Sequence, residues 1–252
     1  MKLKNFAAAA ISAVAMLAGA NAHAIPVATE LALLVDVSGS VDSSEYTLQK
    51  NGYVNAFRDA GLHANIATLA GGIAVTYVEW ASDNEQAQLV NWFHITNAAT
   101  ANAFADLLAA SDRAFSGATA VGSAIRYITP QFATNGFEGA RQIIDVSGDG
   151  TDNDSSQSSA SARDLALAAG VDAINGLPIL GSESGLLNWY KDNVKGGNGS
   201  FVLPAATFED FDTVVKQKIG AEIIAGEVPE PASLALMLLG VAGLAASRRR
   251  KS

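Results

Sequence analysis

A short run of oxygen-bearing side chains, Asp36-Val37-Ser38-Gly39-Ser40, directly follows an apolar stretch at residues 31–35. Residues two apart on an extended chain point to the same side, so Asp36, Ser38 and Ser40 can converge on one point. One carboxylate and two hydroxyls suit a hard divalent cation, and hydroxyl ligands leave that cation able to accept a further anionic ligand. The run therefore predicts cation binding more than catalysis.

Two further oxygen donors stand at comparable places later in the chain. Thr119 ends a glycine-containing loop at residues 116–119, and Asp149 lies between two glycines after an apolar run at residues 141–147. Each candidate taken alone has a simpler interpretation, because aspartates and serines form turns and a threonine before a helix can cap it. Together they form the ordered set D-x-S-x-S, then T, then D.

This order resembles the metal-ion-dependent adhesion site of von Willebrand factor A domains. The resemblance implies that five side chains hold Mg²⁺, with Mn²⁺ or Ca²⁺ as alternatives: Asp36, Ser38, Ser40, Thr119 and Asp149. It also implies that the aspartates bind the metal directly or through water and that a partner's carboxylate completes the coordination. One position departs from the family pattern, since Gly148 stands where a threonine commonly precedes the second aspartate.

Three phrases narrow the resemblance to an uncharacterised bacterial group of secreted von Willebrand A proteins. They are DVSGDG at residues 145–150, INGLPI at 174–179 and FEDF at 208–211. The resemblance extends from residue 30 to about residue 224, and it implies no substrate.

The elements that must position these side chains alternate along the chain. Apolar runs predict strands at residues 31–37, 73–80, 88–95, 141–147, 171–177 and 200–203, with 88–95 at an edge. Helical spacing and capping residues predict helices at residues 42–61, 96–110, 121–132, 160–169, 184–193 and 208–224. This alternation predicts an α/β fold with a doubly wound, mostly parallel sheet flanked by helices. Ligands of such sheets bind beyond the carboxyl ends of the strands, where Asp36 and Asp149 are expected.

The first 24 residues have the layout of a secretory signal peptide. Lys2 and Lys4 precede an apolar stretch at residues 6–20, and Ala22-His23-Ala24 offers a cleavage site. An uncleaved anchor helix is the alternative, although the apolar core is short for one. We therefore expect export, followed by a von Willebrand A-like domain at residues 25–226.

The other end of the chain resembles a PEP-CTERM sorting tail at residues 227–252. Pro229, Glu230 and Pro231 precede a short apolar run at residues 234–246, which would be a transmembrane helix, and a basic cluster at 248–251. The resemblance implies transient anchoring in the inner membrane of a Gram-negative bacterium, processing by an exosortase, and delivery to the cell surface or extracellular matrix. A permanent single-span anchor is the alternative.

The composition of the domain restricts its partners. Setting aside residues 1–24 and the tail from Val228 onward removes six of the 16 basic residues and one of the 25 acidic residues, which leaves a net charge of −14. Nucleic acid is a poor partner for such a surface, because binding to phosphates needs clustered basic residues. The chain has no cysteine, which excludes thiolate catalysis and disulfides.

These observations predict a secreted, surface-directed binding module, not an enzyme, that uses a divalent cation to engage an acidic group on a protein or polysaccharide. A phosphatase resembling haloacid dehalogenases is the main alternative, but it needs an aspartate as general acid where Ser38 stands. A structural matrix protein with a stabilising metal is a further alternative. Asp152 and Asp154 could bind a second ion, although a solvated polar loop is the favoured interpretation.

Overall fold

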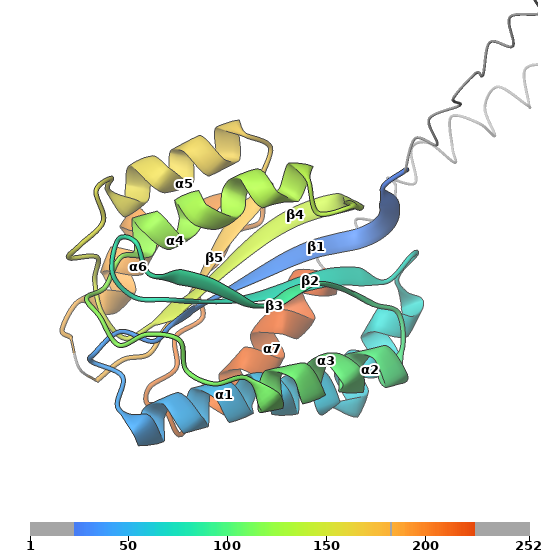
Figure 1. Ribbon diagram of the computed structural model, residues 1–252, viewed down its shortest axis with the longest axis horizontal. Helices are drawn as coiled ribbons and strands as arrows, with labels where there is room; N and C mark the ends of the chain where they lie inside the picture. Colours follow the sequence, from blue (N-terminus) through green and yellow to red (C-terminus); the bar gives the residue numbers. More distant parts are fainter. Residues whose placement is uncertain (1–22, 182, 225–252) are drawn as a thin grey trace, which may run out of the picture.

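A mixed six-stranded sheet forms the centre of the molecule (Figure 1). The computed structural model describes residues 23–181 and 183–224. Its strands, in the order β3-β2-β1-β4-β5-β6, are β3 (Gln86–Ile95), β2 (Ile73–Trp80), β1 (Ile25–Asp36), β4 (Phe137–Gly148), β5 (Ala173–Pro178) and β6 (Gly196–Gly197). The four central strands are parallel, and β3 and β6 run antiparallel to them at the two edges.

Helices cover both faces of the sheet (Figure 1). One layer contains α1 (Ser43–Arg58), α2 (Ala60–Thr68), α3 (Ala98–Ala110) and α7 (Phe211–Ile224). The other contains α4 (Val121–Ile128) with the 3₁₀ turn η1 (Thr129–Ala133), α5 (Ser159–Ala168) and α6 (Leu186–Asn193). The predicted α/β architecture is therefore confirmed.

The central strand β1 is continuously apolar from Leu31 to Val35 because this stretch is buried on both sides. Leu31, Leu33 and Val35 belong to the core beneath α1, α3 and α7, whereas Ala32 and Leu34 belong to the core beneath α4, α5 and α6. A strand covered by helices on both faces loses the polar alternation of a half-exposed strand. This burial fixes the position at which Asp36 leaves the sheet.

The structure corrects the predicted helix at residues 42–61. It is two helices, because α1 ends at Arg58 and the next residue caps α2. The Asp59 carboxylate accepts hydrogen bonds from the backbone N–H groups of Gly61 (2.8 Å) and Leu62 (3.0 Å). An aspartate at this position satisfies two backbone donors at the start of a helix. A second helix therefore begins here, where the prediction had one helix ending at Gly61.

The predicted strand at residues 200–203 is also wrong. Within the described residues, one isolated bridge, between Gly176 and Val202, joins this segment to β5. The strand beside β5 is the two-residue β6, which precedes the predicted segment. The closing helix begins at Phe211, three residues later than predicted.

Candidate metal centre

The carboxyl ends of β1 and β4 are neighbours at the point where the strand order reverses. Within the sheet, β2 pairs with β1 along one of its edges, and β4 pairs with β1 along the other edge. Asp36 is the last residue of β1, and Asp149 directly follows β4. The fold therefore brings these two carboxylates to the same edge of the sheet, where ligands of doubly wound sheets bind.

A chain of contacts joins the side chains predicted to hold a cation. Ser40 Oγ donates to Asp149 Oδ1 at 2.6 Å, and the Oγ atoms of Ser38 and Ser40 are 3.1 Å apart. Thr119 Oγ1 donates to Ser38 Oγ at 3.4 Å, and the backbone N–H of Ser38 donates to Asp36 Oδ1 at 2.8 Å. All five side chains lie together, although Asp36 ends β1 and the other four come from three separate loops.

The site is buried except on one side. Asp36, Ser38, Thr119 and Asp149 are buried, whereas Ser40 is exposed. Asp36 Oδ2 has no hydrogen-bond partner among the described residues. Burial raises the pKa of Asp36 to about 7, the hydrogen bond from the Ser38 N–H opposes this shift, and the nearby charge of Asp149 adds to it.

These observations fit a hard divalent cation. A buried carboxylate oxygen without a donor is costly when ionised, and a bound cation would offset that cost. The donor set consists of oxygens alone, which suits Mg²⁺ and Ca²⁺. Residues 23–181 and 183–224 contain no group of three or more His, Cys, Asp or Glu that could hold a metal, so hydroxyl donors would have to supply much of the coordination.

Arg113, which is not among the residues predicted for the site, holds two of the three loops together. Its Nη2 donates to the carbonyl oxygens of Val37 (2.8 Å), Ser38 (2.9 Å) and Val41 (2.8 Å), and its Nε donates to that of Phe115 (2.8 Å). One side chain thus links the loop that carries Ser38 and Ser40, here called the serine loop, to the loop that carries Thr119. No sequence pattern marks this role, because every residue offers a carbonyl acceptor.

The loop at residues 151–158 positions Thr119. The backbone N–H of Thr119 donates to Asn153 Oδ1 at 3.0 Å, and the N–H of Asn153 donates to the Thr119 carbonyl at 2.8 Å. Thr119 does not cap α4, since Ala120 is the N-cap residue and its own side chain makes no capping hydrogen bond. The capping interpretation of Thr119 is therefore wrong.

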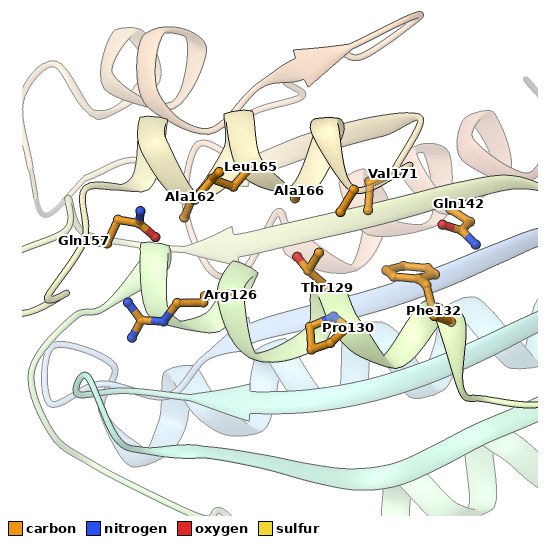
Figure 2. Close-up of a pocket in the computed structure, with 12 residues that line it drawn as sticks. Arg126, Thr129, Pro130, Phe132, Gln142, Gln157, Ala162, Leu165, Ala166 and Val171 are labelled. Carbon is orange, nitrogen blue, oxygen red and sulfur yellow. The ribbon is translucent and has the colours of Figure 1, made fainter.

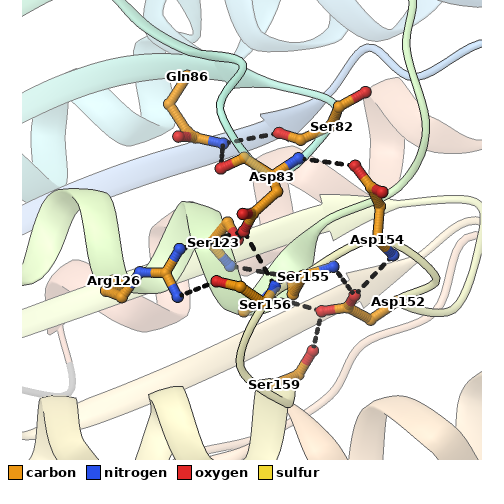
Figure 3. Close-up of polar contacts among 11 residues, drawn as sticks. Ser82, Asp83, Gln86, Ser123, Arg126, Asp152, Asp154, Ser155, Ser156 and Ser159 are labelled. Carbon is orange, nitrogen blue, oxygen red and sulfur yellow. Dashed lines mark hydrogen bonds and ion pairs between the residues drawn. The ribbon is translucent and has the colours of Figure 1, made fainter.

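The acidic side chains of this loop accept hydrogen bonds from the protein (Figure 3). Asp152 Oδ2 accepts from the backbone N–H of Gly122 (2.8 Å) and from Ser159 Oγ (2.6 Å), and Asp152 Oδ1 accepts from the N–H of Ser155 (3.0 Å). Asp154 Oδ2 accepts from the N–H of Asp83 at 2.9 Å. This pattern favours a polar anchor for the start of α4 over a second ion site.

An apolar groove of about 350 Å³ lies elsewhere, between α4 with η1 and α5 (Figure 2). Phe132, Leu165 and Val171 line it, and Arg126 stands near one end. None of the five predicted cation ligands contributes to it.

No helix within residues 23–181 and 183–224 has the length and apolarity needed to cross a membrane. The predicted tail helix at residues 234–246 and the sorting residues Pro229, Glu230 and Pro231 lie outside the described residues, as does the signal peptide up to residue 22.

Comparison with solved structures shows the fold. Proximal thread matrix protein 1 from the mussel byssus superposes with a TM-score of 0.57 at 14% identity, over 80% of this chain and 47% of that protein. A von Willebrand factor type A protein from Catenulispora acidiphila gives 0.56 at 13% identity, over 78% and 43%. The pilus adhesin SpaC from Lactobacillus rhamnosus GG gives 0.55 at 14% identity, over 78% and 30%. This chain spans less than half the length of each.

Comparison with protein families covers most of the sequence. The family described as protein of unknown function (DUF1194) matches residues 26–227, and the PEP-CTERM protein-sorting motif matches residues 227–251. No curated protein matches the sequence. The predicted resemblances to von Willebrand A domains and to PEP-CTERM tails are confirmed. The chain belongs to the DUF1194 family, has the von Willebrand A fold and ends in a PEP-CTERM sorting motif.

Proposed function

We propose that this protein is an exported binding module in which a divalent cation, Mg²⁺ in the first instance, bridges to a carboxylate on a protein or polysaccharide partner. The observation that carries the proposal is the convergence of the side chains of Asp36, Ser38, Ser40, Thr119 and Asp149 at the switch point of the sheet. The partnerless Oδ2 of Asp36 supports it, because a cation would stabilise that buried carboxylate.

The residues have distinct parts in this proposal. The hydroxyls of Ser38, Ser40 and Thr119 would supply neutral oxygens, and Asp36 and Asp149 would supply the negative charge. Hydroxyls are neutral ligands that offset less of the cation's charge than carboxylates do, so they leave the cation better able to accept one more anion. Ser40 is the exposed member of the set, so the partner's carboxylate would approach from its side.

Similar proteins support binding over catalysis. One structure of the mussel thread matrix protein has a zinc-occupied MIDAS motif, and SpaC is a pilus adhesin. At 16% identity or less they support this proposal through the fold they share with the chain. Ser38 occupies the place at which the alternative phosphatase would need its general acid, so we propose that the protein is not an enzyme.

The sorting motif supports a route for the protein. We propose that the chain passes through the inner membrane, is processed by an exosortase at the tail, and reaches the surface or extracellular matrix of a Gram-negative bacterium. Loss of tail processing in cells without the exosortase, followed by mass spectrometry of the chain, tests this route.

Metal binding is tested with Ser38→Ala and Asp149→Ala, and Ser44→Ala on the exposed start of α1 is the matched control. Mg²⁺ should raise the melting temperature of the wild type and the control, because a ligand that binds only the folded state stabilises it. The two site variants should show at most a small rise. Equal Mg²⁺ stabilisation of all four proteins would contradict the proposed site.

Partner binding is tested by capture from the organism's surface fraction with Mg²⁺ or with EDTA. Wild-type and Ser44→Ala proteins should retain the same partner in Mg²⁺ and release it in EDTA, and Ser38→Ala should retain little in either. If Mg²⁺ stabilises the protein but the captured set is the same in EDTA, the metal is structural and the bridging proposal fails.

A further inference from the structure

Tyr190 of α6 reaches the same edge of the sheet as the proposed cation ligands. Its side chain is fully buried, and its Oη has no hydrogen-bond partner among the described residues. Asp36 Oδ2 is likewise a buried oxygen at this edge that has no hydrogen-bond partner within residues 23–181 and 183–224. A hydroxyl and a carboxylate left unpaired inside a protein each cost free energy, so two that lie close together call for an explanation.

Gly148 shows how close these two atoms are. A Cβ atom added to Gly148 would lie 2.6 Å from Asp36 Oδ2 and 2.9 Å from Tyr190 Oη. Both oxygens therefore flank one point at the end of β4. This also explains why the residue before Asp149 is glycine and not the threonine common in von Willebrand A domains, since any side chain there would collide with both atoms.

A second glycine, Gly176, leaves room for the ring of Tyr190. A Cβ atom added to Gly176 of β5 would lie 2.6 Å from Tyr190 Cδ1. The ring thus lies against the backbone of β5, and its hydroxyl points toward the end of β4. Glu183, before α6, fixes the segment further by accepting from the Thr151 backbone N–H (2.7 Å) and Oγ1 (2.9 Å), just beyond Asp149.

A tyrosine hydroxyl is protonated at neutral pH, so it is available as a donor.

We propose that Tyr190 is a positioning residue of the cation site: when the cation binds, its hydroxyl donates to Oδ2 of Asp36 and holds that carboxylate in its cation-binding orientation. This inference rests on the proposed function. Donors that orient metal ligands typically change metal affinity about 10- to 100-fold when they are removed.

Tyr190→Phe tests the inference, because it removes only the hydroxyl. The full-length chain is purified without metal, and Mg²⁺ affinity is measured by calorimetry. Since the hydroxyl is unpaired in the metal-free protein, the variant should melt at or above the wild-type temperature without metal, yet bind Mg²⁺ about 10-fold or more weakly. Mg²⁺ should also change the tyrosine ultraviolet spectrum of the wild type but not of the variant.

Tyr53→Phe is the matched control. Tyr53 is an equally buried tyrosine on the opposite face of the sheet, where its hydroxyl donates to Ser147 Oγ at 3.0 Å. Its loss should lower the metal-free melting temperature and leave both Mg²⁺ affinity and the spectral change intact.

The outcomes separate this inference from the proposed function. Equal Mg²⁺ affinity and an equal spectral change in wild type and Tyr190→Phe would overturn the role of Tyr190 alone. A wild-type protein that binds no Mg²⁺ would overturn both. If Tyr190→Phe melts well below the wild type without metal, the hydroxyl stabilises the fold itself, and the positioning role is overturned.

Discussion

At the scale of single residues, the protein has a buried cluster of charged side chains outside the proposed cation site. Asp145 of β4 and Glu222 of α7 both contact the Lys218 ammonium, and all three side chains are fully buried. Asn175 Nδ2 also donates to Glu222 Oε1 at 2.9 Å. Two carboxylates share one ammonium, and burial raises the pKa of both, that of Glu222 to about 7. The folded cluster therefore keeps a proton up to about pH 7, whereas the unfolded chain loses that proton at a lower pH.

This proton predicts a pH dependence of stability. A glutamate of the unfolded chain titrates near pH 4.3, so between that value and about 7 the folded state binds more protons than the unfolded state. The free energy of unfolding should then fall as pH rises from 5 to 8. Glu222→Gln imitates the protonated side chain and should lose this part of the slope. Urea unfolding in EDTA at several pH values measures it.

The control for this experiment is Asp192→Asn, which changes an exposed carboxylate. It should keep the wild-type slope. If the free energy of unfolding depends on pH in the same way in wild type and Glu222→Gln, then Glu222 releases no proton on unfolding. Asp36 titrates in the same range but is unchanged in both variants, so it cannot account for a difference between them.

At the scale of elements, the proposed site depends on loops that are fixed to one another. Beyond the four carbonyl contacts of Arg113, the Gly39 N–H donates to the Gly117 carbonyl at 2.8 Å. Glu79, near the end of β2, accepts from the Ala114 N–H (2.8 Å) and from the Tyr46 hydroxyl (2.9 Å). The serine loop and the Thr119 loop thus rest on the sheet as one unit.

Arg113→Ala should destabilise this unit. Removing the guanidinium leaves several part-buried carbonyls without their donor, which costs about 1–3 kcal/mol for each one that water cannot reach. We expect a lower free energy of unfolding in guanidinium chloride and weaker Mg²⁺ binding. Arg141→Ala, which removes an exposed contact to the Asn198 carbonyl, should change neither. Wild-type Mg²⁺ affinity in Arg113→Ala would show that the loops hold their positions without the arginine.

At the scale of the whole molecule, α7 carries the chain away from the proposed site. Phe208, just before α7, lines a pocket with Ile179, which follows the carboxyl end of β5. Glu222, near the end of α7, bonds Asn175 in the first half of β5. The helix therefore runs back toward the amino ends of the strands, and its last residue, Ile224, lies away from the proposed site.

This arrangement predicts that the sorting tail is dispensable for cation binding. A chain that ends after residue 226 should keep the Mg²⁺ affinity of the full-length protein in calorimetry. It should also keep the metal-free melting temperature, since the described core ends at Ile224. A fall in Mg²⁺ affinity on truncation would contradict the separation of tail and site.

The sequence by itself determined the features that depend on neighbouring residues. Apolar runs and capping residues predicted the alternation of strands and helices and hence the fold class, because these signals act over one element. The five candidate ligands were also recognisable, since each lies at or near the end of a predicted element. The errors, a helix continued past Asp59 and a strand at residues 200–203, arose where a local cap or an isolated bridge replaced a regular element.

Only the tertiary structure decided which distant residues meet. The adjacency of β1 and β4, the carbonyl contacts of Arg113, and the approach of Tyr190 to Asp36 past Gly148 join segments that are far apart in the chain. Such contacts follow from packing two helical layers on a shared sheet, and a carbonyl acceptor or a buried hydroxyl has no signature in sequence. Residue types therefore indicated the chemistry of the site, whereas packing determined the residues that surround and support it.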